Sequence, residues 1–175
     1  HMFHLGGQEY ERRYGLKYEH LGRIAEINLT NARRNPKAQT RSWSYSPRSF
    51  TADDEANPVI EGMIRRQDCG QVTDGAAAVV LASERFAAQW AARHGRSLDS
   101  IPRIAGWGHR TAHLKLDVKL QASAQQPYVF PHVRDTIQDA FRRAGIHDVF
   151  ELDGIETHDC FTTTEYMAID HFGIT

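Results

Sequence analysis

Residues 153–165 read Asp-Gly-Ile-Glu-Thr-His-Asp-Cys-Phe-Thr-Thr-Thr-Glu, an alternating segment that leads into the opening of a helix. The alternation of the first residues is typical of a strand, and the apolar residues after the segment recur at helical spacing up to Gly173. The sequence therefore predicts a strand, a helix, and between them a tight turn that carries His158, Asp159 and Cys160. Reactive side chains on such a turn are more typical of an active site than of a core.

Two other interpretations of this turn remain open from the residues alone. Asp159 or Thr162 could cap the following helix by accepting hydrogen bonds from its unpaired amides. His158 and Cys160 could bind zinc, but the chain has no second ligand pair at usable spacing, and Cys69 is its only other thiol. We therefore expect no metal site.

The composition is that of a soluble, globular chain. It has 175 residues, 41% hydrophobic content and a formal net charge of −1. No sign of charge dominates and no long apolar run occurs, so we expect neither nucleic-acid binding nor a membrane span. Two widely separated cysteines form no disulfide framework, and no targeting signal is visible, so a reducing, cytoplasmic location is expected.

The hydrophobic pattern predicts alternating strands and helices, which is typical of an α/β fold. Helices are expected at 8–14, 21–32, 86–94 and 133–144, the third of them capped by Ser83, and buried strands at 76–82 and 101–107. A short apolar segment covers 59–64, and 146–150 leads into the strand before the turn. Residues 37–57 and 108–131 show neither period, so we expect a surface loop and a long excursion there.

Two further segments are candidates for ligand contact. The backbone at residues 70–75 has glycine at both ends, so it could pass close to a ligand or to another segment, although Asp74-Gly75 is also a common turn signal. Basic residues flank Trp43 and Tyr45 in the loop at residues 33–48. This mixture could bind a phosphorylated adenine cofactor or form a solvated loop. The basic residues concerned are Arg33, Arg34, Lys37, Arg41 and Arg48.

Together these segments resemble a known family. Asn35-Pro36 with Ala38-Gln39, the run at 74–78 with Ala82-Ser83-Glu84, and the turn motif at 154–161 are similar to the sterol-carrier-protein type of the thiolase superfamily, as are Met2-Phe3, Gly7 and Tyr14-Gly15. The resemblance implies an α/β fold with the layered αβαβα thiolase architecture, only part of it in this chain. Residues 1–75 would form the loop domain that faces coenzyme A, 76–125 the end of the N-terminal half, and 126–175 the start of the C-terminal half.

The resemblance also implies an activity, the thiolysis of 3-oxoacyl-CoA or the condensation of acetyl-CoA, with coenzyme A as substrate and no covalently bound cofactor. His158 would replace the asparagine that anchors a water in the oxyanion hole, and Asp159 would support the turn. Cys160 would match a small residue and not the nucleophile. Arg33, Arg34, Lys37 and Gly70 are the expected contacts to coenzyme A.

The family's nucleophilic cysteine is expected upstream of His1, and its Gly-His-Pro histidine and second cysteine are expected beyond Thr175. We therefore expect this chain to be inactive alone. Because a thiolase cut at these points would have uncovered apolar edges and faces, we also expect a homodimer or a hetero-oligomer. Two alternatives remain: a thiolase-fold steroid side-chain aldolase subunit, and a non-catalytic module that binds acyl-CoA or serves assembly.

Overall fold

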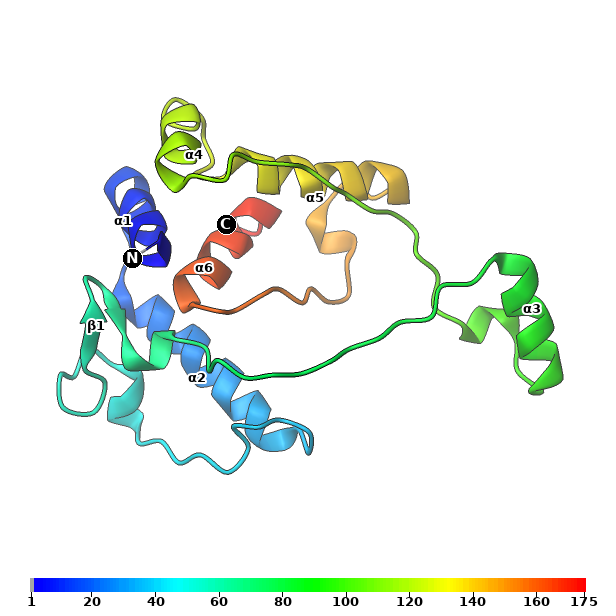
Figure 1. Ribbon diagram of the computed structural model, residues 1–175, viewed down its shortest axis with the longest axis horizontal. Helices are drawn as coiled ribbons and strands as arrows, with labels where there is room; N and C mark the ends of the chain where they lie inside the picture. Colours follow the sequence, from blue (N-terminus) through cyan, green and yellow to red (C-terminus); the bar gives the residue numbers. More distant parts are fainter. Residues whose placement is uncertain (1) are drawn as a thin grey trace.

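The computed structural model describes residues 2–175 and places one helix, α6 (Thr162–Phe172), in the middle of the helical part of the chain. Helices α1 (Met2–Tyr14), α2 (Tyr18–Arg34) and α5 (Pro131–Ala144) all contact α6, and the short helix α4 (Leu116–Ala122) lies beside α1 (Figure 1). Because the candidate turn directly precedes α6, these helices position it.

Local signals in the sequence set the ends of the predicted helices. Gly145 and Gly173 adopt the left-handed conformation, with φ of 73° and 84°, and end α5 and α6 as expected. Helix α3 (Glu84–Arg93) begins after Ser83, whose hydroxyl oxygen accepts a hydrogen bond from the backbone N–H of Phe86 at 3.3 Å. The cap predicted at Ser83 is confirmed.

The sheet of the described chain is small. Strands β1 (Val59–Glu61) and β2 (Ile64–Arg65) pair antiparallel, with Val59 opposite Arg65 and Glu61 opposite Ile64. This hairpin occupies the short apolar segment predicted at 59–64. A mainly helical chain with a small sheet is compatible with the α/β class, but the described residues do not form the layered αβαβα architecture.

The buried strands predicted at 76–82 and 101–107 are wrong for this structure. Both segments cross the molecule as long unpaired threads that lead to and from α3 (Figure 1). Val80 is 92% exposed and Ile104 is 68% exposed. The composition is that of buried strands, but no strand in residues 2–175 pairs with either thread, so neither becomes part of a sheet.

Two smaller expectations are also corrected. The excursion expected at 108–131 contains helix α4, and the segment 146–150 ends in a 3₁₀ helix, Val149–Glu151, instead of leading into a strand. Residues 153–157 form an unpaired connection, so the turn is not held by a strand of a sheet.

Two small apolar clusters lie in the core of the described chain, and α6 contributes to both. Tyr10 and Val129 pack with Met167 in the first, and Ile137 and Phe141 pack toward Phe172 in the second. None of the helices in residues 2–175 combines the length and the apolar character that a membrane crossing requires.

Candidate functional site

The turn before α6 is held by a segment that is distant in sequence. The backbone N–H of Gly70 donates to the carbonyl oxygen of Cys160 at 2.8 Å, and the hydroxyl of Thr162 donates to Oδ1 of Asp68 at 2.8 Å. A Cβ at Gly70 would lie 3.0 Å from the Cys160 carbonyl oxygen, which is tighter than an ordinary contact. The glycine thus permits a close approach between two backbone segments, one of the two roles considered for it above.

The capping interpretation of the turn is wrong. Phe161 occupies the N-cap position of α6, and no side chain caps the helix there. The two residues that could have capped it have other partners: the Thr162 hydroxyl binds Asp68, and the Asp159 carboxylate accepts a hydrogen bond from Asn28.

Asn28 joins two carboxylates across the site. Its side-chain Nδ2 donates to Oδ2 of Asp159 at 2.7 Å and to Oε2 of Glu165 at 2.7 Å. Burial raises the pKa of both carboxyl groups above their ordinary values, and the Asn28 hydrogen bonds partly offset this rise. Oδ1 of Asp159 is buried without a hydrogen-bond partner in the described chain. The position of the Asp159 side chain is therefore set by its hydrogen bond to Asn28 of α2.

Three polar side chains, those of Asn57, Tyr18 and Asp68, form a buried network behind the turn. Asn57 is fully buried and donates to the Tyr18 hydroxyl at 2.6 Å, and that hydroxyl contacts Oδ1 of Asp68 at 3.4 Å. Burial raises the pKa of both Tyr18 and Asp68. The segment at 68–70 that holds the turn is thus anchored to α2.

Neighbouring residues of the turn line different cavities. His158 lines a cavity of about 360 Å³, the apolar cavity, whose other lining residues include Phe3, Phe130 and Met167. Asp159 lines a cavity of about 820 Å³, the large cavity, with Asn28, Arg66, Cys69 and Gly70. The turn therefore forms part of the wall of both cavities.

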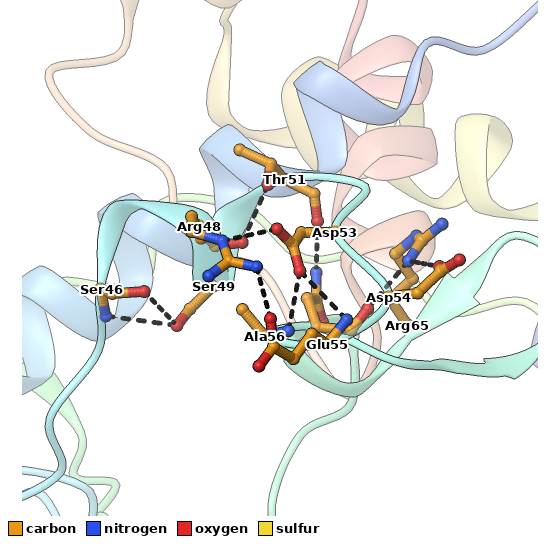
Figure 2. A network of polar contacts seen from close by, with 10 residues as sticks. Ser46, Arg48, Ser49, Thr51, Asp53, Asp54, Glu55, Ala56 and Arg65 are labelled. Atoms are coloured by element: carbon orange, nitrogen blue, oxygen red, sulfur yellow. Dashed lines mark hydrogen bonds and ion pairs between the residues drawn. The ribbon is translucent and has the colours of Figure 1, made fainter.

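The loop at 46–57 supplies a wall of the large cavity through Ser49 and Ala56. A network of charged groups folds this loop on itself: Arg48 pairs with Asp53 at 2.6 Å and with Glu55 at 2.8 Å, and Oδ1 of Asp53 accepts from the backbone of Ala56 at 2.9 Å (Figure 2). These pairs are exposed, so they shape the loop more than they stabilise the fold.

Of the basic residues expected to contact coenzyme A, Arg33 has defined partners. Its guanidinium lies over the Tyr45 ring, 5.6 Å from the centroid, and its Nε donates to the Trp43 carbonyl oxygen at 3.3 Å. Arg33 and Tyr45 line a small cavity of about 180 Å³ beside the large one. The combination of arginine and aromatic residues expected in this loop is therefore present as a packed group.

The other expected contacts are not brought together. Gly70 lines the large cavity, whereas Arg34 and Lys37 are exposed and line neither that cavity nor the small one. The basic residue that lines the large cavity is Arg66, which sequence reasoning missed. Asn28 was also missed as a site residue, although a polar side chain within an apolar helical stripe is the signal that could have identified it.

Both thiols of the chain are free. Cys160 Sγ lies 3.7 Å from the Thr164 hydroxyl, and Cys69 Sγ lies 3.5 Å from the Arg65 carbonyl oxygen. Burial raises the pKa of Cys69, which disfavours its thiolate. In the described chain neither sulfur forms a hydrogen bond with a histidine that could activate it.

The comparisons with known proteins agree on one group of relatives. Sterol carrier protein 2 of Homo sapiens is 25% identical over 178 aligned positions, which cover 99% of this chain and 29% of that protein. Non-specific lipid-transfer protein-like 2 of Caenorhabditis elegans is 27% identical and is covered over 39% of its length by 99% of this chain. Acetyl-CoA acetyltransferase of Methanothermobacter thermautotrophicus is 25% identical over 91% of this chain and 37% of its own length.

The chain thus spans less than half the length of these curated relatives. No family model matches the chain. No solved structure matches it either. The chain is a distant homologue, over nearly its full length, of the thiolase-like sterol carrier proteins and of an acetyl-CoA acetyltransferase.

Proposed function

We propose that this chain forms the acyl-thioester site of a thiolase-type acyltransferase, which cleaves 3-oxoacyl-CoA with coenzyme A or condenses acetyl-CoA. The observation that carries the proposal is the position of the turn between the two cavities, with His158 in the wall of the apolar cavity and Asp159 in the wall of the large one. A thioester that passes the turn could place its acyl chain on one side and its coenzyme A part on the other. The name of one relative, an acetyl-CoA acetyltransferase, supports this substrate class.

In this proposal His158 stabilises the negative charge that develops on the thioester oxygen during the reaction. One ring nitrogen donates a hydrogen bond, directly or through a water, to the thioester oxygen as it becomes an oxyanion. Asp159 does not touch the substrate oxygen. It keeps the turn in place through its hydrogen bond to Asn28.

Catalytic turnover requires other groups besides the hydrogen-bond donor of His158. Thiolysis requires a thiolate activated by a base and a second group that moves the α-proton. Cys69 has a raised pKa, and Cys160 contacts Thr164 and not a base. We therefore expect the chain alone to bind acyl-CoA without cleaving it.

The test replaces His158 with alanine in a full-length thiolase that contains this chain. The free energy of transition-state stabilisation, from kcat/KM for 3-oxoacyl-CoA, should fall by about 2–4 kcal/mol, the usual contribution of one oxyanion donor. The matched control is His147→Ala, which removes an exposed imidazole that lines neither cavity. A loss of about tenfold or less at His158 would contradict the assignment.

A second candidate function is non-catalytic lipid binding. The mainly apolar lining of the cavity beside His158 favours it, and so does the name of a relative, the non-specific lipid-transfer protein-like 2. On this alternative His158→Ala leaves any turnover intact, while blocking the cavity by Ala168→Trp abolishes binding of an acyl chain. The same pair of variants therefore separates the two functions.

A further inference from the structure

The apolar cavity adjoins a fourth cavity, which is lined by more polar residues. This outer cavity has a volume of about 430 Å³ and is lined mainly by polar residues, among them Thr111, His113, Ser123 and Gln126. Lys119 of α4 and His132 of α5 line both the apolar cavity and the outer cavity. His158 lines only the apolar one. A chain that passes through the apolar cavity away from His158 therefore reaches Lys119 and His132.

Lys119 is a positive group without an acidic partner at this boundary. Its side chain is half-buried, and its ammonium forms no ion pair or hydrogen bond in the part of the chain that the structure describes. Burial and the nearby Lys119 charge lower the pKa of His132, so the imidazole is neutral at pH 7 and leaves Lys119 as the charged group. Asp135 lies near His132 but does not pair with Lys119.

The start of α5 adds to this positive potential. The helix is 14 residues long, and its first residue, Pro131, lines the outer cavity. The N-terminal end of a helix favours a negative charge because the peptide dipoles align there. A half-buried ammonium and a helix N-terminus next to an apolar cavity together suit a ligand with an apolar chain and an anionic end.

We propose that the acyl chain bound beside His158 carries a carboxylate at its far end, with the chain in the apolar cavity and the carboxylate at Lys119 and His132. The preferred substrate class is then an ω-carboxyacyl thioester. This inference rests on the proposed function, because the thioester at His158 sets the direction of the chain. The two cavities together have room for a chain of medium length plus a solvated carboxylate.

The test compares two thioesters of equal chain length, 11-carboxyundecanoyl-pantetheine and dodecanoyl-pantetheine, by calorimetric titration of the 175-residue chain. We expect the carboxyl-ended thioester to bind about tenfold more tightly, because one hydrogen bond to a charged group changes affinity by about this factor. Lys119→Met should abolish this preference. Lys119→Arg should retain the preference. Lys115→Met removes an exposed charge from the residue before the same helix and should change neither affinity.

The outcomes separate this inference from the proposed function. If both thioesters bind equally and Lys119→Met affects neither or both alike, the carboxylate end is refuted while the acyl site stands. If neither thioester binds, the proposed function fails and the inference fails with it. A preference that persists in Lys119→Met would place the carboxylate elsewhere and would also refute the inference.

Discussion

Asp68 is the residue on which the candidate turn depends most directly. It is 1% exposed and accepts hydrogen bonds from the Thr162 hydroxyl at 2.8 Å and from the Arg65 backbone N–H at 2.7 Å. Asp68→Ala leaves both donors buried without an acceptor, so the free energy of unfolding should fall by about 2–4 kcal/mol. Urea unfolding measures this free energy, and Asp74→Ala, which removes an exposed carboxylate, is the control. Equal effects of the two variants would show that Asp68 does not hold the turn.

The two carboxylates that share Asn28 should make stability depend on pH. Burial raises the pKa of Asp159 and Glu165, so the folded chain binds these protons more tightly than the unfolded chain. Their favourable contribution is complete below the unfolded pKa values and is lost as pH rises through the raised folded values. Asp159→Asn removes the charge and keeps an acceptor for Asn28, so it should stabilise the chain more at pH 7 than at pH 4.

The measurement is the difference in unfolding free energy between Asp159→Asn and the parent chain across this pH range. Asp153→Asn, an exposed carboxylate in the connection before the turn, is the control and should give a flat difference. A flat difference for Asp159→Asn as well would mean that burial does not raise its pKa in solution.

Among the elements, the helices with clear caps or stops could be predicted from the sequence, whereas the short helix α4 and the strands could not. A helix makes its backbone hydrogen bonds internally, so caps and stops such as Ser83, Gly145 and Gly173 identify its ends locally. A strand needs a partner, and the apolar segment at 76–82 has none in the described chain.

In the candidate site, too, the local features could be predicted and the features that depend on distant residues could not. The turn with His158 was predictable because its residues are consecutive in the sequence. Its supports were not, since Asn28 lies 131 residues from Asp159, and Asp68 lies 94 residues from Thr162. Single-sequence patterns contain no information about contacts at such separations. The Asn28 contact depends on the packing of α2 beside the turn and α6, and the Asp68 contact on the position of the segment at 66–70 beside the same turn.

The second thread, together with the residues that follow it as far as Arg110, is nevertheless packed on one side. A Cβ at Gly108 would overlap the carbonyl oxygen of Thr136, so the thread lies directly on α5, and Arg110 pairs with Asp139 of that helix at 2.7 Å. Gly108→Ala should force the thread away and lower the unfolding free energy by about 1–3 kcal/mol, as overpacking usually does. Gly154→Ala is the control, because its Cβ would meet no atom within 4 Å. Equal unfolding curves for the two variants would show that the thread is detached in solution.

The molecule as a whole exposes more surface than its size predicts. Its accessible surface is 12,572 Å² for a mass of 19.9 kDa. A compact monomer of this mass exposes about 8,700 Å². Figure 1 shows α3 apart from the other helices, at the end of its two unpaired threads, and on these threads Val80 and Ile104 are 92% and 68% exposed. These threads present apolar side chains and unpaired backbone groups together, the combination that promotes pairing with another chain.

We therefore expect the purified chain to self-associate through its threads. Val79 and Leu81, which are 86% and 72% exposed, lie two residues apart and so share one face of an extended backbone. The double variant Val79→Lys, Leu81→Lys should reduce association, because charges on an exposed edge oppose strand pairing. Sedimentation velocity over a range of protein concentrations measures it. The control, Gln8→Lys with Gln121→Lys, adds the same charge on exposed helical positions and should leave association unchanged. The expectation is refuted if the sedimentation coefficient of the parent chain does not change with concentration. If the two double variants have equal effects, association depends on net charge and not on the threads.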